Sequence, residues 1–220
     1  MFKHELVPDL KLKQITLPER RYYETDDGRQ YQSVTTLLGK LPEKKKILES
    51  WRARVGDKEA DRIKNIAGKR GTIIHDALES YLHNEADYMK DLMPVHKVIV
   101  MRMANKLKEQ ITGKVYGIES GLYSNTLKTA GTVDLIADWK DEITVCDFKT
   151  SKRLKSKKQI VDYFLQATAY AIMLRERHGI IAKNICILMH VDNDGVYEYI
   201  EKVSRFEKSA MKIFPILAEK

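Results

Sequence analysis

The stretch "GTVDLIADWKDEITVCDFKT", residues 131–150, most constrains how this chain can fold. Two runs of strand-forming residues flank Lys140 and Asp141, and a polar pair between two such runs is typical of a tight β-hairpin turn. With the turn centred on these two residues, the register places Asp134 directly opposite Asp147. The two side chains then share one face of the sheet, with Cβ atoms about 5 Å apart.

Lys149 lies two residues beyond Asp147 and therefore shares that face. Two facing carboxylates repel each other unless one is protonated or a positive charge lies between them. Lys149 and a divalent metal ion are two candidates for that charge, and oxygen ligands suit Mg²⁺ or Mn²⁺. A metal ion there would polarise a phosphate and acidify a bound water. Lys149 would then orient or deprotonate that water, or stabilise negative charge on the phosphate.

A plainer interpretation of these residues stays open. Charged side chains on an exposed strand often form an ordinary salt bridge with no further role. A slip of one residue in the hairpin register would also put the two carboxylates on opposite faces of the sheet.

The rest of the chain predicts an α/β fold, a mixed sheet flanked by helices. Ser156 and Gln159 have the spacing of a capping box, and Gly179 marks the end of the helix that they begin. Ser204 and Glu207 predict the start of a last helix in the same way. The other predicted elements are a hairpin turning at Asp27-Gly28, helices over 44–108, strands from Val115, and strands 184–191 and 196–202.

The length of 220 residues and the 43% hydrophobic content indicate one domain with a buried core. Within it we distinguish an extension over 1–20, a hairpin and helical region over 21–112, and a sheet core over 113–220. Cys146 and Cys186 lie in apolar runs and are expected to be buried free thiols, because no cysteine cluster indicates a zinc or iron–sulfur site.

No apolar run approaches the ~18 residues that cross a membrane, so we expect a soluble protein with no membrane partner. The first residues do not resemble a targeting peptide. The expected location is the cytoplasm of a bacterial or phage-infected cell, and a mitochondrial one only if a transit peptide precedes this sequence.

Charge favours a polyanionic partner. The net charge is +8, and the segment "SKRLKSKK" directly follows the strand that carries Lys149. Such a run is most often a solvated loop, but here it would raise the local concentration of DNA or RNA. The residues expected to contact such a substrate are Thr150, Ser151, Lys152 and Arg153.

Three further polar residues have two interpretations each. His75 lies beside the apolar helix positions Leu78 and Leu82, so it is either a hydrogen-bonded core residue or an imidazole ligand to the metal. Gln166 and Tyr170 are four residues apart on one helix face. They form an amphipathic boundary or hold a phosphate or a base.

Four motifs in order resemble the PD-(D/E)xK nuclease superfamily in its RecB-like branch. They are "RGTIIHDALE", "GTVD", "DFKT" and "QATAY". The segment "YQSVTTLLGKLPEKKKILESWRAR" is similar to the mitochondrial genome maintenance exonuclease group and to its phage and bacterial relatives. The resemblance covers about residues 22–179.

The resemblance implies a restriction-endonuclease-like core. It also implies a DNA exonuclease dependent on Mg²⁺ or Mn²⁺ that prefers single strands or free ends, acting in replication, recombination or repair. Asp134, Asp147 and Lys149 would be catalytic, and both aspartates would bind the metal. His75, Glu119 and the carbonyl of Phe148 would complete the metal ligands, while Gln166 and Tyr170 would orient the substrate.

Two alternatives remain. A structure-specific endonuclease of the same superfamily would carry the same residues. A non-catalytic protein that binds single-stranded DNA would instead use aromatic residues interleaved with cations, such as Tyr22, Tyr23 and Tyr31.

Overall fold

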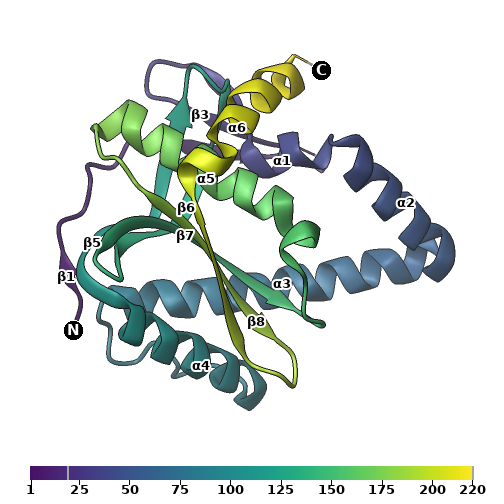
Figure 1. The fold of residues 1–220 in the computed structure, drawn as a ribbon. Coiled ribbons are helices and arrows are strands. Elements are labelled where there is room, and N and C mark those ends of the chain that lie inside the picture. The colour runs from purple at the N-terminus through teal and green to yellow at the C-terminus, as the bar shows by residue number, and fades with distance from the viewer. Residues whose placement is uncertain (19, 220) are drawn as a thin grey trace.

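A mixed, nine-stranded sheet with helices on both faces forms the centre of the molecule, as a computed structural model describes it for residues 1–18 and 20–219 (Figure 1). This confirms the predicted fold class. The strands are β1 (Lys3–His4), β2 (Lys13–Thr16), β3 (Arg21–Glu24), β4 (Gln30–Ser33), β5 (Ile111–Ser124), β6 (Thr129–Trp139), β7 (Glu142–Ser151), β8 (Asn184–Val191) and β9 (Val196–Lys202). The helices are α1 (Val34–Gly39), α2 (Pro42–Val55), α3 (Asp57–Leu82), α4 (Pro94–Gln110), α5 (Val161–His178) and α6 (Val203–Ala218).

The central hairpin has the predicted register. Strands β6 and β7 pair antiparallel from Trp139–Glu142 to Leu135–Cys146. Lys140 and Asp141 have φ values of 50° and 66°, the left-handed conformation at both positions that a type I′ turn requires.

Strand β6 exchanges its partner along one edge. Its first two residues pair with β4 in parallel, through Gln32–Thr129 and Ser33–Ala130. On the same edge, the ladder with β7 begins only at Leu135. The segment 131–134 therefore lies between two diverging strands, where side chains can reach into the space that a third strand would fill.

The other edge of β6 pairs with β5 over nearly its whole length. The pairs Ile118–Leu135 and Ser120–Val133 put Glu119 opposite Asp134. The sequence offered no register for Glu119, and its φ of 42° is unusual for a residue with a side chain.

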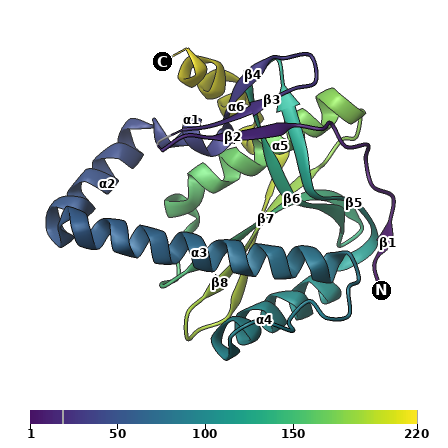
Figure 2. The same cartoon turned by 180° about the vertical axis from the view of Figure 1, so that it is seen from behind.

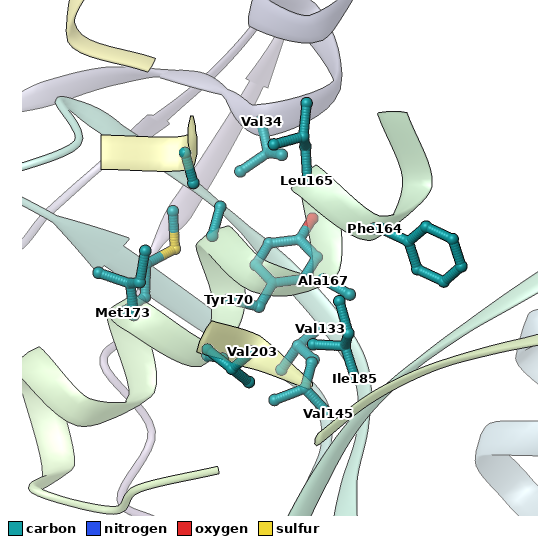
Figure 3. Packing of buried hydrophobic residues seen from close by; sticks show 14 of the residues in the cluster. Val34, Val133, Val145, Phe164, Leu165, Ala167, Tyr170, Met173, Ile185 and Val203 are labelled. Atoms are coloured by element: carbon teal, nitrogen blue, oxygen red, sulfur yellow. The ribbon is translucent and has the colours of Figure 1, made fainter. Parts of the chain in front are cut away.

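The two faces of the sheet carry two hydrophobic clusters. Helices α1, α5 and α6 cover one face, and α3 and α4 cover the other (Figures 1 and 2). Helix α5 is buried along most of its length, and its Phe164, Leu165, Ala167 and Tyr170 belong to the same hydrophobic cluster as Val133 of β6 (Figure 3). This burial fixes α5 against the diverging segment of β6.

Helix boundaries agree with the sequence in most places. The capping box of Ser156 and Gln159 is present, but it begins a short 3₁₀ turn, Lys157–Ile160, that leads into α5. Gly179 ends α5 with a φ of 70°, as predicted.

The predicted start of the last helix is wrong by one residue. Helix α6 begins at Val203, and the preceding Lys202 makes no side-chain capping bond. Strand β9 runs directly into α6 here. Ser204 is therefore already helical and cannot be the N-cap residue.

The first twenty residues contribute to the sheet. Strand β1 pairs in parallel with β5, and β2 pairs with β3. The division into an extension and two regions stays a prediction, although the extension holds two strands.

Two smaller expectations can be compared with the structure. Cys146 and Cys186 are buried free thiols, as predicted, and they lie side by side on β7 and β8. No described helix combines the length and the apolar composition needed to cross a membrane.

Candidate active site

A cavity of about 470 Å³ opens where β4 and β7 diverge from β6. Strands β6 and β7, helices α3 and α5, and the β2–β4 region all contribute to its wall. Predicted site residues in this wall are His75, Glu119, Asp134, Asp147, Lys149, Gln166 and Tyr170.

His75 joins two carboxylates and a main-chain carbonyl. Its Nδ1 lies 3.6 Å from Glu119 Oε1 and 3.5 Å from Asp134 Oδ1. Its Nε2 donates a hydrogen bond to the carbonyl oxygen of Phe148 at 3.1 Å. Burial disfavours the charged ring, but the negative charge of Asp134 outweighs it and raises the pKa of His75 to about 10. The imidazolium therefore neutralises the carboxylates in the metal-free protein.

Asp134 is held by the neighbouring strand. The amide of Phe148 donates to Asp134 Oδ2 at 2.5 Å, just beyond Leu135–Cys146, the last pair of the β6–β7 ladder. Burial works to raise the pKa of Asp134, but the charge of His75 and its hydrogen bonds hold the pKa below its ordinary value. Asp134 is 8% exposed, so this carboxylate is buried and ionised.

Asp147 is the least satisfied group of the cavity. It is 1% exposed, and its Oδ1 has no hydrogen-bond partner among the described residues. Lys149 forms an ion pair with Oδ2. Burial raises the pKa of Asp147 to about 6. The positive charge of Lys149 lowers this pKa only in part, and the negative charge of Asp134 raises it further.

Lys149 is held as a cation. Burial works against its charge, but Asp147 and Asp134 together raise the pKa of Lys149. Its Nζ also lies 5.2 Å from the ring centre of Tyr163, and the Nζ of Lys155 lies 5.1 Å from the same ring centre. Without a metal, Lys149 is thus a hydrogen-bond donor at neutral pH and not a base.

Gly131, the first residue of "GTVD", makes room for Tyr170. A Cβ atom at position 131 would lie 2.8 Å from Tyr170 Oη and 2.9 Å from the ring edge. Tyr170 is 3% exposed, and burial raises its pKa well above the usual range, so its hydroxyl stays protonated. Gly131 and Tyr170 thus form one close contact between β6 and α5.

Four residues predicted to bind substrate lie outside this cavity. Thr150 pairs with His190 and alternates with Lys149, so it points to the opposite face of the sheet. Ser151 donates to the carbonyl of Arg153, and Lys152 and Arg153 are exposed at the end of β7. Their contact with a substrate stays a prediction.

Sequence reasoning missed several residues of the cavity. Thr72 and Glu79 lie three residues before and four residues after His75, a spacing on one helix face that could have been noticed. Gln14 and Arg21 come from the N-terminal strands, and no motif marked them. Tyr23 donates a hydrogen bond to Gln14 and shares another with Thr132, so this tyrosine is part of the cavity wall.

The sequence profile of the PD-(D/E)XK nuclease superfamily matches residues 48–197, more than half of the chain. The chain belongs to the PD-(D/E)XK nuclease superfamily. The matched segment includes α3 and β5 to β8, and so His75, Glu119, Asp134, Asp147 and Lys149. Nucleases of this superfamily use divalent metal ions.

The comparisons with curated proteins and with solved structures give less information than the superfamily profile. No curated protein matches this chain in sequence. The chain is similar to a candidate exonuclease from Eubacterium rectale, with 12% identity and a TM-score of 0.44 over 69% of this chain. That match covers 64% of the other protein, so this chain spans less than two thirds of its length. It is also similar to the protein SSO0001, with 12% identity and a TM-score of 0.34 over 67% of this chain and 73% of that one.

The residues of the cavity fit a divalent metal ion. His75, Glu119 and Asp134 offer ligand atoms that all lie within 4.8 Å of one another. The buried Oδ1 of Asp147, which lacks a partner in the described structure, adds a further oxygen. This mixture of carboxylate oxygens and one imidazole suits Mg²⁺, Mn²⁺ and related ions.

Replacing Gly131 with alanine should lower the free energy of unfolding by about 1–3 kcal/mol, because the new methyl group overlaps the buried ring of Tyr170. Urea unfolding measures the change. Gly121→Ala is the matched control, since a Cβ there meets only the flexible side chain of Leu12, at 3.3 Å. Equal losses in the two variants would show that the Tyr170 contact is not tight.

Replacing Asp147 with asparagine should stabilise the metal-free protein at neutral pH. The unfolded carboxyl loses its proton near pH 3.8 and the folded one only near 6, so wild-type stability falls as the pH rises between these values. The difference corresponds to at most ~3 kcal/mol, reduced because Lys149 loses its partner. Urea unfolding in EDTA from pH 4 to pH 8 checks this.

The advantage of Asp147→Asn should grow between pH 4 and pH 6 and then stay constant. The exposed Asp91 provides a control, and Asp91→Asn should show no such trend. An Asp147→Asn variant that is less stable than wild type at pH 7 would contradict the proposed burial cost.

Proposed function

We propose that this protein is a divalent-metal-dependent DNA exonuclease of the RecB-like branch. It would hydrolyse phosphodiester bonds in single strands or at free ends during replication, recombination or repair. The observation that carries the proposal is one cavity that holds His75, Asp134, Asp147 and Lys149 together. Membership of the nuclease superfamily supports the reaction class, while the preference for single strands or free ends rests on the proposal alone.

In this proposal His75, Asp134 and Asp147 hold Mg²⁺ or Mn²⁺, with Glu119 and the carbonyl of Phe148 as further ligands. The bound cation would polarise a phosphate oxygen and lower the pKa of a water molecule. Its charge would replace that of the His75 imidazolium between the carboxylates, and His75 would bind it as a neutral ring.

The other groups of the cavity act on the substrate through their own hydrogen bonds. Lys149 keeps its ammonium group at the wall, where it would donate to a phosphate oxygen as negative charge develops. Gln166 and Tyr170 supply an amide and a protonated hydroxyl from α5 that would orient the strand.

A basic groove next to the cavity supports a polyanionic substrate. This hollow of about 910 Å³ shares Arg21 and Thr35 with the catalytic cavity. It is lined by cations from β3, α2, α3 and the segments next to β3 and α1, and by no described carboxylate; the cations are Arg20, Arg21, Lys40, Lys45 and Lys64.

The groove cations have no salt-bridge partner among the described residues, although Lys40 donates a hydrogen bond to the carbonyl oxygen of Leu217. Burial and the positive charges of Arg20 and Lys45 lower the pKa of Lys40. Lys45 and Lys64 form no salt bridge with a described residue. A chain of phosphates would relieve this repulsion, and the exposed Leu48 offers a surface for a base.

Asp147→Ala and Lys149→Ala should each reduce cleavage of end-labelled single-stranded DNA at least about a hundredfold, since each removes a group placed at the reacting phosphate. DNA binding should stay near the wild-type level. Cleavage with Mg²⁺, with Mn²⁺ and with EDTA measures the effect, and EDTA should abolish it.

Lys108→Ala, a change of an exposed cation on α4, is the control and should cleave normally. Full activity of either active-site variant would refute the mechanism. Closed circular single-stranded DNA separates the two enzyme alternatives, because an endonuclease cuts it and an end-dependent enzyme leaves it intact.

Lys45→Gln and Lys64→Gln should weaken binding of single-stranded DNA and lower the slope of log affinity against log salt by about 0.7 each. The reason is that each lysine would release about one counterion on contact with a phosphate. Fluorescence anisotropy over a salt series measures both slopes. If the slopes equal that of wild type, the strand does not follow this groove.

A further inference from the structure

A second hollow lies across α3 from the catalytic cavity. Its volume is about 550 Å³, and it is enclosed by α3, the first turns of α4 and the end of β8. Arg70 lines it, while the next residue, Gly71, lines the catalytic cavity. His190 lies on the sheet face opposite Lys149, so the two side chains point in opposite directions.

Several buried nitrogen atoms around this hollow lack partners. His190 is 3% exposed, and neither of its ring nitrogens has a hydrogen-bond partner among the described residues. Its Nδ1 lies 3.8 Å from Asp192 Oδ1, beyond hydrogen-bond distance. The same holds for Nε of Arg70 and Nδ1 of His96. Buried polar groups without partners cost free energy, so four such atoms at one hollow indicate a ligand or bound water.

The charge of the hollow favours an anion. Asp192 neutralises Arg70 through a two-pronged ion pair, and Arg102 forms no salt bridge within the described chain. Burial lowers the pKa of His190; the positive charges of Arg70 and Arg102 lower it further, while the charge of Asp192 opposes them. The ring is therefore neutral and offers one hydrogen-bond donor. The described groups here do not form a metal-binding cluster, unlike those around His75.

One wall of the hollow is apolar. Val95, Val98 and Ile99 of α4 line it, and Val95 and Val98 are 59% and 43% exposed. An apolar wall beside cationic donors suits a ligand with a phosphate group and a flat ring, and the volume is that of a small-molecule site. A nucleotide has this composition.

We propose that this hollow binds one nucleotide, with its phosphate on Arg102, Arg70 Nε and His190 and its base against the valines of α4. The nucleotide is a free nucleoside 5′-monophosphate or the end of a single strand, which share this chemistry. The inference rests on the proposed function for the source of the nucleotide, but binding here does not require cleavage.

The test is binding to the full chain in EDTA. Isothermal titration calorimetry would use deoxyadenosine 5′-monophosphate, inorganic phosphate and a short single strand with a 5′-phosphate. We expect the monophosphate to bind more tightly than phosphate, and Arg102→Gln to weaken it about tenfold, the effect of one charged hydrogen bond. Tighter binding of the strand than of the monophosphate, with the difference lost in Arg102→Gln, would identify the strand end as the natural source.

Two variants locate the site. Lys108→Gln removes a cation from the other end of α4 and should leave the affinity unchanged. Asp147→Asn alters the catalytic cavity and should also leave it unchanged, so loss of binding there would assign the nucleotide to the catalytic site and overturn the inference. Equal binding by Arg102→Gln, equal affinity for inorganic phosphate, or no binding at millimolar concentration would overturn it too. None of these results depends on whether the protein cleaves DNA.

Discussion

The divergence of β4 and β7 from one edge of β6 is the constraint on which the site depends. Residues 131–134 have no strand partner on that edge, so the hydrogen bonds and the space of a missing strand are open to side chains. Asp134 fills both roles, since its carboxylate accepts a hydrogen bond from the amide of Phe148 and also lines the cavity. The two long helices close the opening, α3 with His75 and α5 with Tyr170, and the catalytic cavity is what remains between them.

The buried carboxylates of the cavity lower the stability of the metal-free protein. Two carboxylates, of Glu119 and Asp134, lie beside the His75 imidazole, and the nearby Asp147 is buried with an oxygen that no described group satisfies. In the metal-free state the charges of His75 and Lys149 offset part of this cost. A divalent cation would offset more of it, so the arrangement that weakens the empty fold is the one that favours metal binding. The basic groove has the opposite charge, and an added polyanion would stabilise its cations, which have no salt-bridge partner among the described residues.

Local signals in the sequence predicted the centre of the fold and much of the site. The two-residue turn at Lys140 and Asp141 sets the β6–β7 register, and a slip of one residue would move every side chain to the other face of the sheet. Glu119 could not be placed, because β5 has irregular pairing near Val115 and Glu119 adopts a left-handed conformation. Gln14 and Arg21 depend on short strands whose pairing is set by the rest of the sheet. The unpartnered atoms around His190 arise from three distant segments, which no motif connects.

The most direct test of the central claim is binding of Mn²⁺ to the purified protein, followed by electron paramagnetic resonance. The account predicts that wild type binds Mn²⁺, that histidine nitrogen couples to the bound ion, and that Asp134→Asn loses both signals while remaining folded. Binding of equal strength in Asp134→Asn, or bound Mn²⁺ without coupling to nitrogen, would contradict a metal site built from Asp134 and His75.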